Sequence, residues 1–331
     1  SMKKLPSGGG ALLLDTYSGA KVAFSVRKLS TTYSGACLRV RRSNDNAEQD
    51  INFLSGNLDT SALTTFVGAN DGFVTTWYDQ SGNGKNMIQT NTGYQPQILF
   101  SGSLKYINSR PTIDFYGNKG VNYKTNTKMA TAMVVIKSEY TNWPNYHAIL
   151  DGGGRIGGLL ESGNTNFHYN SYGSALWKNG TSIGTNESLG PTNQPMVVSF
   201  NSTLAASNGY VSALCIGNYD SGDSYNGGSI LQSEAIAFET TASIADRQKV
   251  EINQGSYYGI SSVVGANSGS GVWTSDDTSI AVVNSTTGVV TGQDQGTVNI
   301  NYTYTNTAGC SATVTKNITV NIGPVIAATA G

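Results

Sequence analysis

Thr297-Val298-Asn299-Ile300-Asn301-Tyr302-Thr303-Tyr304 alternates between polar and apolar side chains at every position. Successive side chains of a β-strand point to opposite faces, so this alternation predicts a strand with one buried face. Shorter runs rich in Val, Ile, Tyr, Phe and Thr recur along the whole chain, bounded by Gly, Asn and Ser. Many short strands separated by turns are typical of sandwiches of antiparallel sheets, so we predict an all-β fold.

The predicted strands fall into two groups. The first group is Lys21–Val26, Leu38–Arg42, Phe73–Tyr78, Pro111–Phe115, Met129–Lys137, Met196–Phe200, Tyr210–Ile216 and Glu234–Phe238. The second group is Gly271–Thr274, Ile280–Asn284, Gly288–Thr291, Thr297–Tyr304 and Ala312–Val320.

Two local signals are specific enough to predict particular elements. Asn179-Gly180 lies inside the run 175–183, and both residues tolerate the positive φ angles of a type I′ turn, so a hairpin is expected there. Ser243 is a suitable N-cap for a helix over residues 244–252, with Asp246 in its first turn. This is the one helix that we predict with a defined start.

The composition excludes several classes of protein. Only 12% of the 331 residues are charged, and the formal net charge is −1, so a nucleic-acid binder driven by phosphate contacts is not expected. The sequence has no apolar run of about 18 residues, so we expect no membrane insertion. Cys37, Cys215 and Cys310 are too widely spaced for a metal-binding pair and are expected to be buried thiols.

Composition also divides the chain. Residues 261–270 are rich in Ser, Gly and Asn and are predicted to form a linker. The sequence from 271 to 322 lacks His, Met, Phe and Leu and is dominated by Thr, Val and Asn. We therefore expect a large domain over 8–260, a small β-sandwich over 271–322 and a tail over 323–331.

The small domain resembles the bacterial Ig-like group 2 family. The resemblance rests on Trp273, Ser275, Ala281 and Val283, followed by the phrase Thr287-Gly-Val-Val-Thr-Gly292 and then by Gly296 and Ile300. Members of that family begin with two strands before the tryptophan, whereas here about ten linker-like residues precede Trp273. The resemblance implies a surface spacer or adhesion module, incomplete at its start.

The large domain is similar to concanavalin A-like lectin/glucanase domains. The phrases that carry this resemblance are Leu12-Leu-Leu-Asp-Thr-Tyr17, Arg27-Lys-Leu-Ser-Thr-Thr-Tyr-Ser-Gly35, Trp77-Tyr-Asp-Gln-Ser-Gly-Asn-Gly84 and Ala245-Asp-Arg-Gln-Lys-Val-Glu251. Similar phrases occur in phage tail proteins and bacterial surface proteins. The phrase over 78–84 also resembles the catalytic domain of family 54 α-L-arabinofuranosidases. The expected fold is therefore a jelly-roll sandwich.

The enzyme resemblance implies two catalytic carboxylates. A retaining glycosidase needs an acid/base and a nucleophile about 5–5.5 Å apart. The stretch 217–227 is similar to the part of the family sequence that holds the acid/base, which makes Asp220 or Asp223 the candidate. Glu161 is the candidate for the nucleophile. The residues leave open whether the chain is an enzyme.

The residues themselves suggest a shallow sugar-binding site. Sugar hydroxyls pair with planar polar groups, and sugar C–H faces pack on aromatic rings. Carboxylate oxygens also suit Ca²⁺, so a calcium ion near Asp79 or Asp220 is the one cofactor that the sequence allows. The candidate ligand-binding residues are Trp143, Trp177, Asp220, Asp223, Tyr225, Asn226, Asp79 and Asn83.

Three functional hypotheses follow. The first is carbohydrate binding in adhesion, on a polysaccharide or cell-surface glycan, by an extracellular, cell-surface or virion protein that works with other domains or subunits of a larger assembly. The second is a glycoside hydrolase that resembles α-L-arabinofuranosidase. The third is a structural decoration protein without a ligand. Two converging acids would favour the second hypothesis, and a surface without exposed aromatic side chains would favour the third.

Overall fold

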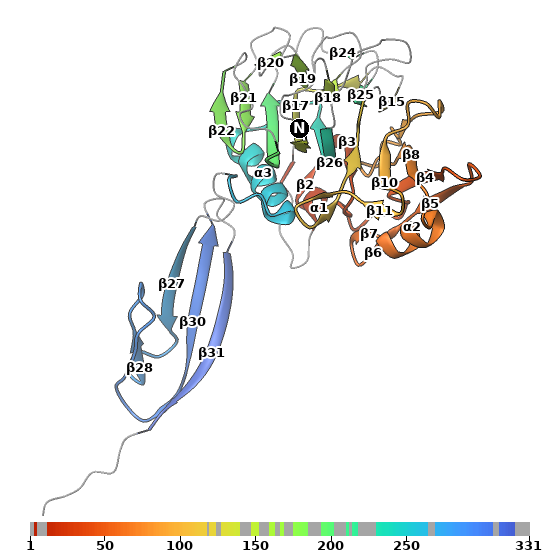
Figure 1. The fold of residues 1–331 in the computed structure, drawn as a ribbon. Coiled ribbons are helices and arrows are strands. Elements are labelled where there is room, and N and C mark those ends of the chain that lie inside the picture. The colour runs from red at the N-terminus through yellow and green to blue at the C-terminus, as the bar shows by residue number, and fades with distance from the viewer. Residues whose placement is uncertain are drawn as a thin grey trace, which may run out of the picture. The chain divides into compact units, whose positions relative to one another are not determined.

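The computed structural model describes residues 3–4, 12–117, 119–123, 127–139, 147–151, 159–162, 166–168, 175–184, 193–201, 210–211, 214–217, 230–263, 269–306 and 311–321. The chain folds into two compact units, Ser1–Val264 and Gly265–Gly331, which we call the N-terminal and C-terminal units (Figure 1). Among the described helices, none combines the length and the apolar character that a membrane crossing requires.

The described elements are mostly short strands. The helices are α1 (Leu13–Thr16), α2 (Thr60–Val67) and α3 (Ile244–Tyr258). The strands before residue 115 are β1 (Lys3–Lys4), β2 (Tyr17–Ser18), β3 (Ala20–Ser25), β4 (Leu38–Arg42), β5 (Glu48–Ile51), β6 (Phe53–Leu54), β7 (Asn57–Leu58), β8 (Gly72–Trp77), β9 (Met87–Ile88), β10 (Gln97–Phe100), β11 (Ser103–Leu104), β12 (Tyr106–Ile107), β13 (Arg110–Pro111) and β14 (Ile113–Asp114). Those that follow are β15 (Gly120–Tyr123), β16 (Thr127–Lys128), β17 (Thr131–Ser138), β18 (His147–Asp151), β19 (Leu159–Ser162), β20 (Asn166–His168), β21 (Ala175–Lys178), β22 (Thr181–Ile183), β23 (Met196–Asn201), β24 (Tyr210–Val211), β25 (Leu214–Gly217) and β26 (Ile230–Phe238). The C-terminal unit contains β27 (Gly269–Ser275), β28 (Ala281–Val283), β29 (Val290–Gly292), β30 (Gly296–Asn306) and β31 (Ser311–Val320).

The N-terminal unit is an antiparallel β-sandwich, which confirms the predicted fold class. One run of paired strands is β3-β26-β17-β23-β21-β22. The other is β5-β4-β8-β9-β15-β25-β18-β19-β20. Trp77 of β8 packs against Phe24 of β3 with ring centroids 5.8 Å apart and against Phe115 at 6.5 Å. Side chains from both runs therefore meet in one apolar core.

Strand β26 lies at the centre of this unit, and all nine of its residues are buried. Its opposite edges pair with β3 and β17. Ile236 and Phe238 belong to a cluster that also contains Val250 of α3 and Leu13 of α1. Because helices cover one face and the second run of strands covers the other, polar residues of β26 must find partners inside the protein.

Helix α3 begins where the sequence predicts. The Ser243 side chain accepts a hydrogen bond from the backbone N–H of Asp246 at 3.1 Å, and Gly259 ends the helix in the left-handed conformation with φ 65°. The helix is longer than expected, because Tyr257 and Tyr258 still belong to it. Tyr258 is buried against the sheet, so packing extends the helix beyond its local signals.

Three other features differ from the sequence-based expectation. Helix α2 was not predicted; Asp59 caps it by accepting from Ala62 N at 2.9 Å. The single strand predicted over Pro111–Phe115 is broken into β13 and β14. Strand β27 begins at Gly269, inside the segment predicted as a linker.

The predicted hairpin over 175–183 is confirmed. Strand β21 pairs with β22, with Lys178 opposite Thr181. Asn179 and Gly180 have φ angles of 50° and 82°, as a type I′ turn requires.

The C-terminal unit has a three-stranded sheet, in the order β27-β30-β31, and a β28-β29 hairpin. Its buried cluster consists of Ala281, Val298 and Ile300, with Trp273 among the partly buried residues around it. Gly288 has a φ of 72°, and a Cβ atom there would lie 2.6 Å from the Trp273 ring. Glycine is therefore required at this turn both by conformation and by the close approach of the tryptophan.

Candidate functional site

The loop that follows β8 is held to the sheet by Asp79. One carboxylate oxygen, Oδ1, accepts from the backbone N–H groups of Ala23 and Ser81, both at 2.9 Å. The other, Oδ2, accepts from Lys85 N at 3.0 Å and from the Ser81 hydroxyl at 2.8 Å. Asp79 is 3% exposed, so its charge is satisfied by fixed donors inside the protein.

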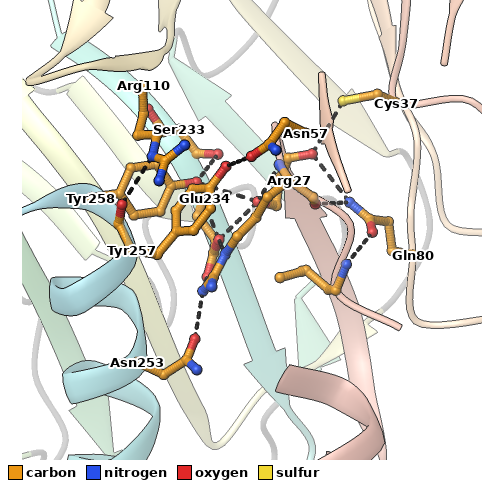
Figure 2. Close-up of polar contacts among 12 residues, drawn as sticks. Arg27, Cys37, Asn57, Gln80, Arg110, Ser233, Glu234, Asn253, Tyr257 and Tyr258 are labelled. Atoms are coloured by element: carbon orange, nitrogen blue, oxygen red, sulfur yellow. Dashed lines mark hydrogen bonds and ion pairs between the residues drawn. The ribbon is translucent and has the colours of Figure 1, made fainter. Parts of the chain in front are cut away.

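Gln80 makes a second attachment. Its Nε2 donates to the carbonyl oxygens of Ser25 and Arg27 at 3.1 and 3.0 Å, and its Oε1 accepts from Leu29 N at 2.8 Å (Figure 2). A single amide side chain thereby holds the segment that follows β3 to the loop after β8. This role needs both a donor and an acceptor at the end of one side chain, which glutamine provides.

Asn83 closes the loop. Its Nδ2 donates to the carbonyl oxygens of Ala20 and Lys21 at 3.0 and 3.1 Å and to the Ser81 hydroxyl at 2.9 Å. Gly82 and Gly84 have φ angles of 86° and 67°, which glycine adopts without strain. The structure thus brings together Asp79 and Asn83, two of the predicted ligand-binding residues, and their side chains anchor the turn.

A buried ion pair lies next to this loop. Arg27 donates from Nε to Glu234 Oε2 at 2.8 Å and from Nη2 to Oε1 at 3.0 Å (Figure 2). Glu234 also accepts from the hydroxyls of Ser25 at 2.8 Å and Tyr258 at 3.2 Å. Burial alone would lower the pKa of Arg27, but the charge of Glu234 outweighs it and raises that pKa. Arg27 also donates to Asn253 Oδ1 at 2.8 Å, which links β3, β26 and α3.

Tyr257 connects the buried ion pair to Arg110 of β13 and to Asn57 of β7. The guanidinium carbons of Arg27 and Arg110 lie 4.4 and 4.1 Å from the centroid of its ring. Tyr257 also donates a hydrogen bond to Asn57 Oδ1 (Figure 2). Two cations on one ring and the hydrogen bonds around it hold these side chains together.

Trp177, predicted as a sugar platform, lies in β21 and is partly buried. The Arg247 guanidinium carbon is 3.9 Å from the centroid of its ring. Arg247 and Glu251 form a buried ion pair one helical turn apart, and Ser199 donates to Glu251. Burial raises the pKa of Glu251, and the charge of Arg247 opposes that shift. The tryptophan thus packs on a cation of the protein itself.

Other predicted site residues lie outside the described residues. They are Trp143, Asp220, Asp223, Tyr225 and Asn226. Glu161 is placed by its backbone in β19, opposite His147 of β18 and Phe167 of β20. Within the described part of the chain there is no group of three or more His, Cys, Asp or Glu side chains that could hold a metal ion.

Arg39 and Arg41 differ in exposure although they lie only two positions apart in β4. Arg39 pairs with Glu48 at 2.7 Å and with Asp50 at 3.1 Å. Arg41 is only 7% exposed and donates to Gln95 Oε1 at 2.7 Å. A bulge between β4 and β8 lies at this point, and the sequence carries no clear signal for it.

A cavity of about 320 Å³ opens beside the loop. Its wall is formed by residues of the segments 14–20, 30–35 and 80–82. All three segments overlap phrases that carry the resemblance of the large domain, but only the third lies next to predicted ligand-binding residues, Asp79 and Asn83.

Comparison with solved structures identifies the class of fold. Two structures of family 54 α-L-arabinofuranosidase share it, one soaked with a cyclic sulfate inhibitor and one a mutant soaked with 4-nitrophenyl α-L-arabinofuranoside. Each is 15% identical in sequence, covers 85% of this chain and 71% of its own, and superposes with a TM-score of 0.52. At this identity the likeness establishes the fold alone.

The sequence comparison is more specific over part of the chain. A family model described as "Alpha-L-arabinofuranosidase B, catalytic" matches residues 16–157. No curated protein matches the sequence. The matched range includes Asp79, Gln80 and Asn83, and it ends before β19 and before the acidic stretch that follows β25.

Proposed function

We propose that the N-terminal unit is a carbohydrate-active domain, and that it hydrolyses glycosides as α-L-arabinofuranosidases do. The observation that carries the proposal is the agreement of two independent likenesses. The family model matches residues 16–157, and the whole sandwich shares its fold with two arabinofuranosidase structures. We therefore prefer the glycoside-hydrolase hypothesis to the adhesion hypothesis, although the sequence alone favoured adhesion.

The strand order supports the proposed pair of acids. Strand β18 lies between β25 and β19, so Gly217, Ala148 and Leu160 form one row across three strands. Neighbouring strands are about 4.8 Å apart, which places the backbone of Gly217 about 10 Å from that of Leu160. Glu161 follows Leu160, and Asp220 lies three residues after Gly217.

A retaining mechanism needs its two carboxylates roughly 5–5.5 Å apart, so the proposal requires Glu161 to approach Asp220 or Asp223 to that distance. Glu161 would then attack the anomeric carbon. Asp220 or Asp223 would protonate the leaving oxygen and afterwards activate the water that releases the sugar.

The test is hydrolysis of 4-nitrophenyl α-L-arabinofuranoside. We expect activity in the native chain, and losses of about 10²–10⁴-fold in Glu161→Gln and in either Asp220→Asn or Asp223→Asn. Asp45→Asn is the matched control, since Asp45 pairs with Arg42 at the surface. Absence of activity on arabinofuranosides, or full activity in Glu161→Gln, would overturn the proposal.

The remaining parts of the chain extend the proposal. The C-terminal unit would be an Ig-like spacer, and the protein would act outside the cell or on a virion surface, where polysaccharide is accessible. A calcium ion would bind near Asp220, where carboxylate oxygens are available as ligands. Affinity electrophoresis in arabinan and arabinoxylan, with and without Ca²⁺, tests polysaccharide binding and its dependence on calcium. If the protein were retarded in the gel but did not hydrolyse the polysaccharide, the results would favour the hypothesis of glycan binding in adhesion.

A further inference from the structure

The cavity beside the loop has an uncharged, hydroxyl-rich wall. Hydroxyl side chains come from four serines, one threonine and one tyrosine, namely Ser18, Ser30, Ser34, Ser81, Thr32 and Tyr33. The wall contains no Asp, Glu, Lys, Arg or His. Each hydroxyl both donates and accepts, as the hydroxyls of a sugar ring do. An anionic or cationic ligand would lose its hydration here without gaining a countercharge.

The wall is held in place by hydrogen bonds behind it. Ser30 Oγ lies 2.9 Å from Asp15 Oδ1 and 2.9 Å from Thr32 Oγ1. Ser81 is bonded to Asp79, and Gln80 is bonded to the backbone on three sides. A ligand would therefore meet a surface that is already ordered, which reduces the entropic cost of binding.

Ser34 stands at the opening of the cavity. Its side chain is exposed and has no hydrogen bond to any residue that the structure describes. Its hydroxyl is therefore available to a ligand, whereas the Ser30 and Ser81 hydroxyls each bond to several protein groups and hold the wall in place.

Tyr33 supplies an aromatic face. Its hydroxyl donates to Ala36 O at 2.8 Å, and its ring meets Phe53 edge-on with centroids 6.3 Å apart. A Cβ atom at Gly35 would lie 2.5 Å from the Tyr33 hydroxyl oxygen, so glycine leaves room for the ring. Burial raises the pKa of Tyr33 to about 12, which keeps this wall neutral. A partly exposed tyrosine ring suits the apolar C–H face of a sugar.

We propose that this cavity binds one neutral sugar ring, a furanose or a pyranose, as a site without catalytic function. Its volume of about 320 Å³ is at the lower end of the roughly 300–1,000 Å³ typical of ligand pockets, so one ring fits and a long oligosaccharide does not. The wall contains no carboxylate and therefore cannot supply the acid pair that glycoside hydrolysis requires. The inference is independent of the proposed catalytic residues.

The test is a titration followed by ¹⁵N–¹H NMR, with L-arabinose, D-xylose, D-galactose and D-glucose as separate probes and D-galacturonate as the charged comparison. We expect at least one neutral sugar to shift the amide signals of Gly19, Gly35 and Gly82, with a dissociation constant in the millimolar range. Galacturonate should shift them less. Absence of shifts at these amides with every neutral sugar would overturn the proposal.

Two variants locate the binding. Ser34→Trp places a bulky side chain at the opening and should abolish the shifts, whereas Ser61→Trp, on the exposed first turn of α2, should leave them unchanged. Tyr33→Leu keeps an apolar side chain but removes the aromatic face, and should weaken binding about fivefold. Unchanged affinity in Ser34→Trp would contradict the assignment.

Folding of each variant is checked by its amide spectrum before titration. The titration reads binding at named amides and needs no turnover. Its failure is therefore distinguishable from a failure of the proposed hydrolysis, which is read from release of 4-nitrophenol.

Discussion

Strands β26 and β31 have similar lengths but opposite environments. All nine residues of β26 are buried, including Gln232, Ser233 and Glu234. In β31, eight of ten residues are exposed and the other two are partly buried. Exposed Val314, at 71%, is the most exposed large hydrophobic residue among those that the structure describes. The N-terminal unit thus places polar and charged groups inside, and the C-terminal unit leaves apolar groups outside.

The difference follows from how many faces of each sheet are covered. Helices and a second layer of strands enclose β26, so its polar groups need designated partners such as Arg27 for Glu234. In the C-terminal unit one face of the sheet carries paired polar side chains, such as Thr303 with Thr313 at 2.8 Å and Asn317 with Asn299 at 2.9 Å. Water can replace those partners, so each pair contributes little to stability.

The largest expected effect is at the buried ion pair. Glu234→Ala leaves the Arg27 guanidinium buried without its countercharge and should lower the free energy of unfolding by about 3–5 kcal/mol. The control is Glu48→Ala, which breaks the exposed pair with Arg39 and should cost no more than about 1 kcal/mol. Urea unfolding of the N-terminal unit measures both. Similar losses in the two variants would contradict the contrast between buried and exposed pairs.

The second effect is in the small core of the C-terminal unit. Ile300→Ala should cost about 2–5 kcal/mol there, because the residue is 3% exposed. A core of this size rarely supplies more than about 3–5 kcal/mol, so the unit should unfold. Calorimetry should show its transition lost and that of the N-terminal unit unchanged.

Val314→Ala is the matched control for this experiment. The residue is exposed, so its truncation should change stability by no more than about 0.5 kcal/mol. If Ile300→Ala also lowered the transition of the N-terminal unit, the two units would not be independent.

The third effect compares two turns held by one side chain each. Asp79→Ala leaves buried N–H groups, that of Ala23 among them, without an acceptor and should cost about 1–3 kcal/mol. Asn284 accepts from Thr286 N and Thr287 N in an exposed turn, so Asn284→Ala should cost about 0.5 kcal/mol or less. Chemical unfolding of each unit distinguishes them, and equal costs would show that burial is not the deciding factor.

The smallest effect is a dependence on pH. Burial raises the pKa of Asp15, but hydrogen bonds from Thr31 N, Leu12 N and the Ser30 hydroxyl outweigh it, so the pKa lies below 3.8. A lowered pKa in the folded state means that the stabilisation is present above about pH 4 and is lost as the pH falls further. Asp15→Asn should remove that dependence. Amide exchange at Thr31 between pH 5 and 2.5 measures it.

Asp277 in the C-terminal unit provides the comparison. Its pKa is lowered mainly by the Ser279 side chain, two residues away. Protonation of Asp277 should therefore loosen one turn, whereas protonation of Asp15 should release residues 12 and 31 from each other. Equal changes in amide exchange around both aspartates would contradict this difference.

The sequence predicted the structural elements that are determined by interactions between neighbouring residues. The turn at Asn179-Gly180 and the N-cap at Ser243 were both found, because each depends on residues within four positions. Helix α2 carried a usable signal in Asp59, but threonine and valine are weak helix formers, and no helix was predicted there. Burial of Arg41 involves a contact with Gln95, which is distant in sequence, and could not be read from neighbouring residues.

For the candidate site, too, the sequence predicted the local features but not the contacts between distant segments. The sequence singled out the phrase over 77–84, with Asp79 and Asn83 as candidate ligand residues, and its Asp, Asn and Gly residues are of the kinds that favour turns. The groups to which it is attached, among them Ala23 N and Leu29 N, lie about fifty residues earlier in the chain and have no sequence signature. For the same reason, the cavity wall at 30–35 was not expected, because it depends on contacts between segments that are far apart in sequence.

The pairing of β3 with β26 has a consequence for how the chain folds. Arg27 and Glu234 are separated by 207 positions in the sequence. One edge of β17 also remains unpaired until β26 has been synthesised. During synthesis the run Met133-Val-Val-Ile136 therefore emerges about a hundred residues before its partner strand. Contacts of such long range make closure slow, and an unpaired apolar strand promotes association between nascent chains. Refolding yield should consequently fall as protein concentration rises, and chaperones that shield β17 should restore it.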